Sequence, residues 1–179
     1  MKALAISAII MATALTACNN NSTNEPPVTN LPINQCFIPT QQWIDKSDTE
    51  LRRVCDQLNG KLFVVNSADE LPADIFGFSD PYTKADYSNS TILIYYHLHR
   101  WEMQSYFYSF YRDNVENRDL VWQIRNNVGG TLTPYPDKRQ FTRYAIAVNK
   151  IPAGQKVVAG VSLSMAWPWD DDDISEWGD

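Results

Sequence analysis

The sequence has few of the residues on which catalytic and nucleic-acid sites usually depend. Its 179 residues include two histidines and three cysteines, with 15 Lys and Arg against 21 Asp and Glu. The net charge of -6 argues against nucleic-acid binding, which requires a basic surface that displaces counterions from phosphates. The sequence also lacks a G-x-S-x-G elbow, a P-loop and a G-x-G-x-x-G pattern. We therefore expect no cofactor, no nucleic-acid partner and no enzymatic activity.

The sequence lacks a hydrophobic run long enough to span a membrane. Residues 3–15 are almost all apolar, but a transmembrane helix needs about 20 such residues, and the shorter run has the length of a signal-peptide core. The run leads into Leu15-Thr16-Ala17-Cys18, which resembles the bacterial lipobox. The motif predicts a lipoprotein signal peptide over residues 1–17 and lipid attachment, including palmitate, at Cys18. A plain secretory signal with a nearby A-x-A cleavage site is the alternative.

The residues after Cys18 indicate a cellular location and a flexible tether. In enterobacterial-type sorting, Asp at the next position favours the inner membrane, so Asn19 is compatible with the outer membrane of the cell envelope. Residues 18–34 are rich in Asn, Pro, Ser and Thr and have no apolar period, which predicts a flexible tether. Apolar residues make up 44% of the chain, enough for a packed core. We expect one globular domain over residues 35–166 and an acidic, Trp-containing tail over residues 167–179.

The two remaining cysteines, Cys36 and Cys55, predict a structural disulfide. Export places them in an oxidising compartment, and closing a loop of this size contributes about 3 kcal/mol in the chain-entropy model. A redox pair or a metal site is the alternative. Redox pairs are usually closer in sequence, however, and no histidine lies near either cysteine.

The element pattern predicts an α+β fold, mostly antiparallel β sheet or sandwich with one or two short helices. Ser47 and Glu50 form a capping box ahead of an apolar stripe, which predicts a helix over residues 47–60. A short apolar run over residues 61–66 predicts a buried strand. Runs rich in β-branched and aromatic residues predict further strands. These strands cover residues 91–98, 106–111, 120–125, 141–148 and 156–165.

Three segments carry a family resemblance: residues 65–71 (VNSADEL), 86–94 (DYSNSTILI) and 143–150 (RYAIAVNK). They are similar to the I-N-S-x-E-E-L, D-F-S-x-x-T-L-L and W-x-x-A-I-x-V-x-K segments of small exported lipoproteins of the Bacteroidota type. The layout over residues 61–165 also resembles the protease-complex-regulator (PrcB-like) C-terminal domain. That domain has Gly-Gly-Tyr before its central strand, whereas Thr131 follows the two glycines here. The resemblance therefore implies a fold and export, and no catalytic residues.

Histidine and aromatic side chains recur at strand spacing. His97 and His99 share one face of a strand, where a third ligand from a neighbouring strand would complete a metal site. An amphipathic outer or edge face is the simpler explanation, and we expect no metal. Tyr106, Tyr108 and Phe110 share one face of the next strand. One face of that strand must be core, and the other exposes aromatic rings; we take Tyr106, Tyr108 and Phe110 as the candidate surface for binding a protein or a glycan. The alternative is that both faces are covered.

The function that we expect is that of a membrane-anchored lipoprotein acting as a non-enzymatic binding module. The alternative is a carboxylate-dependent hydrolase of the cell envelope, because the predicted loops carry acidic side chains. These are Asp69, Glu70, Asp80 and Asp86. Their convergence in one buried cleft would favour the hydrolase, whereas scattered, exposed carboxylates would favour the binding module.

Overall fold

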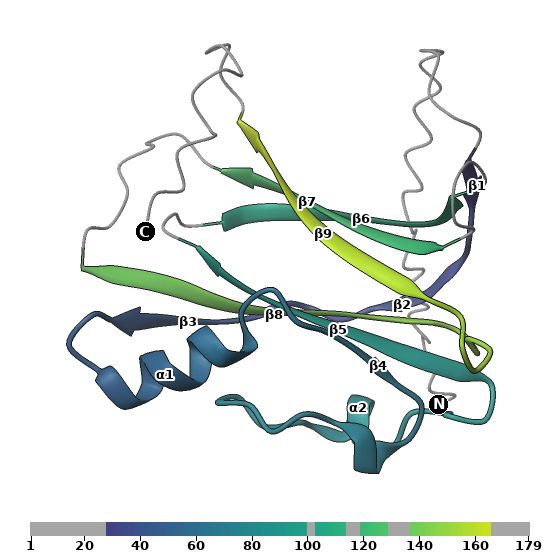
Figure 1. The fold of residues 1–179 in the computed structure, drawn as a ribbon, viewed down its shortest axis with the longest axis horizontal. Coiled ribbons are helices and arrows are strands. Elements are labelled where there is room, and N and C mark those ends of the chain that lie inside the picture. The colour runs from purple at the N-terminus through teal and green to yellow at the C-terminus, as the bar shows by residue number, and fades with distance from the viewer. Residues whose placement is uncertain (1–27, 100–102, 114–118, 129–136, 166–179) are drawn as a thin grey trace, which may run out of the picture.

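The computed structural model describes residues 28–99, 103–113, 119–128 and 137–165. Two β sheets pack face to face, and short helices cover the outer face of one of them (Figure 1). The predicted α+β class with mostly antiparallel strands is confirmed. The signal peptide, Cys18 and the acidic tail lie outside the described residues.

Sheet B has the strand order β2-β8-β5-β4, and β3 also pairs with β8. All of its pairings are antiparallel. The long strand β8 is its centre, because it pairs with β5 on one side and with β2 and β3 in turn on the other. The strands are β2 (Ile33–Cys36), β3 (Thr40–Asp45), β4 (Leu62–Val65), β5 (Ser90–His99) and β8 (Lys138–Asn149).

Sheet A has the order β1-β6-β7-β9, with β7 and β9 parallel and the other pairings antiparallel. Its strands are β1 (Val28–Asn30), β6 (Met103–Asp113), β7 (Leu120–Val128) and β9 (Val157–Met165).

Strands β1 and β2 lie in a segment for which we predicted a tether. The prediction of a tether over residues 18–34 is wrong from Val28 onward, because residues 28–30 pair with β6 and Ile33 pairs with Val148 of β8. The backbone amide of Leu31 also donates to the carbonyl of Phe110 at 2.8 Å. An edge strand needs backbone hydrogen bonds more than buried side chains, so the polar composition did not prevent pairing.

The described helices are short and lie against sheet B (Figure 1). They are α1 (Thr49–Leu58), the 3-10 turn η1 (Ala68–Glu70) and α2 (Asp80–Thr83). The cap of α1 is Asp48, whose carboxylate accepts from the amide of Leu51 at 3.0 Å, and not Ser47 as predicted. None of the helices described is long and apolar enough to cross a membrane.

Sheet B separates two apolar clusters. Alternate residues of β5 point to opposite faces, so Ile92, Ile94 and Tyr96 pack beneath the helices while Leu93 and Tyr95 pack against sheet A. Because both faces are covered, β5 is a nearly continuous apolar run and not an alternating one.

A buried ion pair between Arg143 of β8 and Asp74 fixes residues 74–79, which cover sheet B and which we call the covering segment. Their side chains are 4% and 0% exposed, and Nη1 of Arg143 lies 2.7 Å from the Asp74 carboxylate. The same nitrogen donates to the carbonyl of Gly77 at 2.7 Å. The hydroxyl of Tyr96 donates to Asp74 at 2.8 Å, and the amide of Phe76 donates at 2.9 Å. Each charge is therefore compensated by several hydrogen bonds.

Three aromatic rings complete the surroundings of Arg143. The ring centroids of Phe76, Phe78 and Tyr82 lie 5.4, 4.3 and 5.0 Å from its guanidinium carbon. A cation over aromatic faces is attracted by the ring quadrupoles, most strongly when water is excluded. The ion pair thereby joins the covering segment and α2 to the centre of sheet B.

We expect Asp74→Asn to lower the free energy of unfolding by about 3–5 kcal/mol, because it leaves a buried guanidinium without its counter-charge. Urea denaturation followed by circular dichroism measures this loss. Asp80→Asn is the control, since Asp80 and Lys84 form an ion pair in which both side chains are 73% exposed and exposed pairs contribute little. Equal effects of the two substitutions would contradict the role assigned to the buried pair.

Candidate functional site

The loop carboxylates do not form an acid–base pair in the part of the chain that is described. Asp69, Glu70, Asp80 and Asp86 are all exposed. Glu70 accepts from the amide of Asn66 at 2.6 Å, and Asp80 pairs with a lysine one helical turn away. Hydrogen bonds from Ser88 and then Asn89 lower the pKa of Asp86. These three carboxylates therefore stabilise their own turns.

The predicted disulfide is wrong, because Cys36 and Cys55 are both free. Cys36 on β2 lies opposite Ile146 of β8, which packs between the two sheets. Cys55 is on α1 and belongs to the cluster on the other face of sheet B. The two thiols are thus on opposite sides of a sheet. Partial desolvation raises the pKa of Cys36, although the residue is exposed, and burial followed by the charges of Asp56 and Asp48 raises the pKa of Cys55 to about 11.

We expect one thiol to react with a thiol reagent in the folded protein carrying Cys18→Ser, and the second to react only after denaturation. The reactive group is Cys36, which is exposed, whereas Cys55 is fully buried. Cys36→Ser should change the free energy of unfolding by less than about 0.5 kcal/mol, as for ordinary surface substitutions. If neither thiol reacted in the unreduced protein, even after denaturation, the predicted disulfide would be correct.

The predicted binding residues Tyr106, Tyr108 and Phe110 face the interior, which corrects their assignment as a binding surface. Phe110 is 5% exposed, and the hydroxyl of Tyr108 is buried. The rings of Tyr106 and Tyr108 lie 6.4 and 6.5 Å from that of Tyr144 in sheet B. This aromatic face of β6 is the one that packs against the second sheet.

These tyrosines meet both histidines in a polar group between the sheets, which we call the interlayer cluster. The imidazole Nε2 of His99 lies 2.8 Å from the hydroxyl of Tyr144, which also accepts from the side-chain amide of Asn126 at 2.9 Å. The rings of His97 and His99 are 4.3 Å apart. The two histidines share a face as predicted, but it points inward and is not an outer or edge face. No group of three metal-ligating side chains occurs among the residues described.

The interlayer cluster also contains polar atoms without protein partners. They are Tyr108 Oη, Trp122 Nε1 and Asn126 Oδ1, all buried. Unpaired buried polar groups destabilise a fold by about 1–3 kcal/mol each. These three atoms therefore reduce the stability that packing between the two sheets contributes.

We expect stability to fall as the pH drops from 6.5 towards 4. Burial lowers the pKa of His97 to about 4, and burial together with His97 lowers that of His99 to about 2. Imidazoles of the unfolded chain titrate near 6.5, so the unfolded state binds more protons than the folded state in this window. The free energy of unfolding therefore falls by about 1.4 kcal/mol for each histidine with each unit by which the pH drops. Denaturation at pH 6.5 and pH 5 measures the slope, and His97→Gln should halve it. An unchanged slope in that variant would contradict the assignment.

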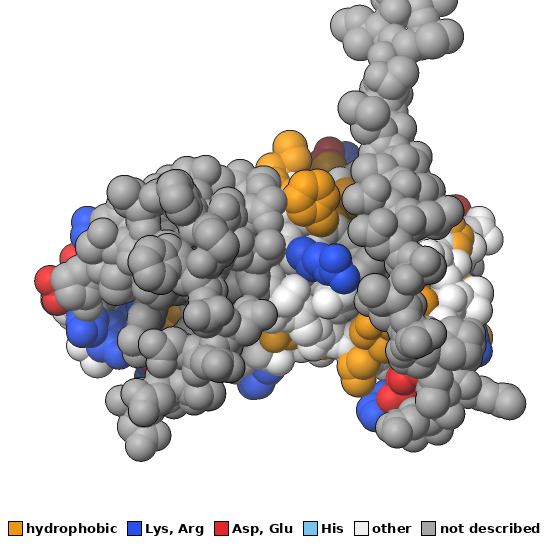
Figure 2. Space-filling model, turned by 90° about the horizontal axis from the view of Figure 1, so that it is seen from above, with side chains coloured by type: hydrophobic (Ala, Val, Ile, Leu, Met, Phe, Trp, Pro, Cys, Tyr) orange, Lys and Arg blue, Asp and Glu red, His pale blue; other side chains and the backbone are white. Residues whose placement is uncertain are grey.

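Among the described residues, no element packs on the opposite side of sheet A, which we call the open face. Its residues alternate with the inward-facing ones: Val28, Asn30, Phe107, Ser109, Tyr111, Asp113, Val121, Gln123, Arg125, Val158, Gly160 and Ser162. Phe107 is 61% exposed and Val28 is 42% exposed. Figure 2 shows hydrophobic side chains beside a basic one on this side of the molecule. No described helix lies over it (Figure 1).

Phe107 and Arg125 form the centre of the open face. They are directly opposite one another on β6 and β7, so their side chains are neighbours. The guanidinium of Arg125 donates to the side-chain carbonyl of Gln123 at 3.3 Å. The sequence of β7 indicates which face of β6 is buried. Leu120, Trp122 and Ile124 alternate along β7 and are buried, and the residues of β6 that pair with them lie on its inner face.

Comparison of the chain with models of protein families, with curated proteins and with solved structures finds no match in any of the three. The functional argument therefore depends on the geometry of the described residues.

Proposed function

We propose that this protein is a lipid-anchored, non-enzymatic binding module of the cell envelope, held in the outer membrane, whose open face docks a protein partner. The observation that carries the proposal is the exposure of Phe107. Its ring lies on a sheet face without a described cover, although most large apolar side chains in the described chain are buried. Exposed aromatic surface of this kind is typical of interaction sites.

The composition of the open face favours a protein over a glycan. Phe, Tyr and Arg are enriched at the centres of protein interfaces, and Phe107, Tyr111 and Arg125 supply all three. Gln123, a natural hydrogen-bonding group for a sugar, is already bonded to Arg125. A complementary partner presents an apolar side chain to Phe107 and a carboxylate to Arg125. Asp113 is on the same face, at the far end of β6 beside Val28.

The position of β1 supports anchoring of this sheet near a membrane. Val28 is the first residue of an edge strand of sheet A. The ten residues from Cys18 to Val28 span at most about 35 Å when fully extended. A lipid on Cys18 would therefore keep the open face within reach of partners in the same membrane.

The hydrolase alternative finds less support in the described residues. Glu70, Asp80 and Asp86 are exposed and engaged in local turns. General acid–base catalysis needs carboxyl groups placed across a substrate, with at least one pKa raised. Asp86 has its pKa lowered.

We expect Cys18→Ala to release the protein from the membrane fraction without altering its fold, because Cys18 precedes the first described strand by ten residues. Fractionation of cells after a high-salt wash measures release, and circular dichroism measures folding. Retention of the folded variant in the membrane would contradict the lipid anchor.

We expect a photo-crosslinking amino acid at position 107 to give a discrete, saturable protein adduct in intact cells. Arg125→Glu should reduce its yield by about tenfold, the effect of losing one charged contact of about 1.4 kcal/mol. The control is the same photo-crosslinker at Ile38, which is 84% exposed but lies in the segment between β2 and β3 of sheet B.

Equal adducts at positions 38 and 107, or an adduct insensitive to Arg125→Glu, would reject the open face as a docking site. An adduct that is destroyed by periodate and contains no peptide would assign the face to a glycan, and would overturn the protein partner.

A further inference from the structure

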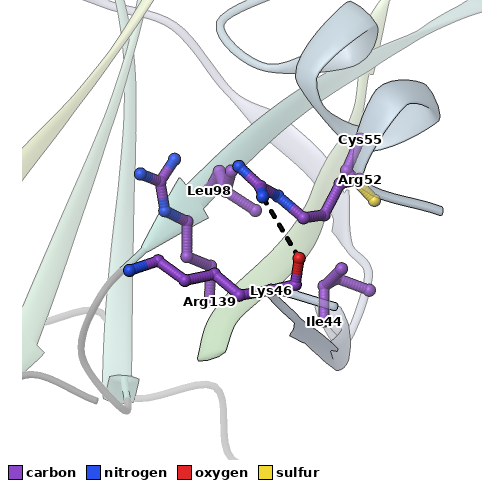
Figure 3. Close-up of a pocket in the computed structure, with 6 residues that line it drawn as sticks. All are labelled: Ile44, Lys46, Arg52, Cys55, Leu98 and Arg139. Carbon is purple, nitrogen blue, oxygen red and sulfur yellow. Dashed lines mark hydrogen bonds between the residues drawn. The ribbon is translucent and has the colours of Figure 1, made fainter. Parts of the chain in front are cut away.

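A small hollow at the other side of the molecule gathers three cations. Its volume is about 10 Å³. Residues of β3, α1, β5 and β8, together with the turn after β3, line it (Figure 3). They are Ile44, Lys46, Arg52, Cys55, Leu98 and Arg139.

Within the described residues, the three cations of the hollow form no ion pair with an acidic side chain. No carboxylate of the described chain forms an ion pair with Lys46, Arg52 or Arg139, although the protein carries a net charge of -6. Two acidic side chains close to these cations in sequence are bonded to backbone amides. Asp48 caps α1 through the amide of Leu51, and Asp45 accepts from the amide of Ser47 at 3.0 Å.

Hydrogen bonds restrain the side chain of Arg52 and the backbone of Lys46. Arg52 Nη1 donates to the carbonyl of Lys46 at 3.2 Å, the contact drawn as a dashed line in Figure 3. The backbone amide of Lys46 donates to the carbonyl of Asp137 at 2.8 Å, next to the start of β8 that carries Arg139. Arg52 and Arg139 are each partly buried. Less side-chain freedom is therefore lost when these groups bind a ligand.

The size of the hollow and the cations around it suit a single oxygen atom of a larger anionic group. A cavity of this volume holds a single water-sized group. Its apolar lining includes Ile44 and Cys55, which are buried. Guanidinium groups match the oxygens of phosphates and carboxylates through paired hydrogen bonds. One oxygen of such a group fits the hollow while the others meet the surrounding cations.

We propose that Lys46, Arg52 and Arg139 form an oxyanion-binding site that takes a phosphate or carboxylate group. The site is separate from the open face and independent of the proposed function. Asp56 lies one helical turn beyond Arg52, and the described ion pairs do not include one between them. Two sources of oxyanion share this chemistry: a free ligand, and the chain's own Asp170–Asp173, which lie outside the described residues.

Titration of the mature, full-length protein with inorganic phosphate at constant ionic strength tests the site. The readout is the NMR signal of the arginine Nε–H groups, with chloride as the reference anion. We expect saturable shifts at Arg52 and Arg139, and about tenfold weaker binding in each of Arg52→Gln and Arg139→Gln. Arg53→Gln is the matched control and should bind like the wild type, because Arg53 is on the same helix but already pairs with Glu50 at 2.6 Å.

A second arm separates the two sources of oxyanion. In a variant with Asp170–Asp173 replaced by Asn, tighter phosphate binding identifies the acidic run as a competing occupant, and unchanged binding identifies a free ligand; both outcomes retain the site. Non-saturable shifts, or equal losses in Arg52→Gln and Arg53→Gln, would show an adventitious ion only and overturn the proposal. Melting temperatures of all variants exclude unfolding as the cause.

Discussion

The ion pair between Arg143 and Asp74 is the interaction on which the arrangement of this molecule depends. Removing two charges from water is costly, and the cost is recovered only where further hydrogen bonds satisfy both groups. Here Gly77, Phe76 and Tyr96 supply such bonds to the pair. Burial, followed by the bond to Asp74, raises the pKa of Tyr96 well above its usual value, so that its hydroxyl remains a donor. The guanidinium also lies against the aromatic rings of Phe76, Phe78 and Tyr82.

This constraint decides which surface of the sandwich is free. The ion pair holds residues 74–82 against β8 and β5. These residues cover the outer face of sheet B, and an apolar cluster fills the space between them and the sheet. Sheet A has no corresponding cover among the described residues, and its outward aromatic ring at Phe107 remains exposed. The same sheet begins with β1, ten residues after the expected lipid attachment point. The proposed docking function follows from this asymmetry between the two sheets.

Most strands could be predicted because their signal is local. β5, β7 and β8 are long and rich in β-branched and aromatic residues, and each lies where the sequence predicts it. β1 to β3 were missed because short, largely exposed strands depend on backbone pairing with partners far away in the chain. The ion pair joins residues 69 positions apart, and no sequence spacing identifies such a contact.

The candidate site was harder to predict than the fold, because it depends on which side of a strand faces in. The run containing Tyr106 to Tyr111 has aromatic residues on both faces, so its own pattern is ambiguous. The disulfide failed for a related reason: proximity in sequence did not reveal that sheet B lies between Cys36 and Cys55. In both cases the missing information was the pairing of strands across the sheet.

Hydroxyl-radical footprinting of the protein, purified and in intact envelopes, tests the central claim of one sealed and one open sheet face most directly. In the purified protein, we expect rapid oxidation of Phe107, which is 61% exposed, and slow oxidation of Tyr82, which is 5% exposed. In the envelope, oxidation of Phe107 should fall while that of Ile38 stays unchanged. Equal oxidation of Phe107 in both preparations, or rapid oxidation of Tyr82 in the purified protein, would contradict the account.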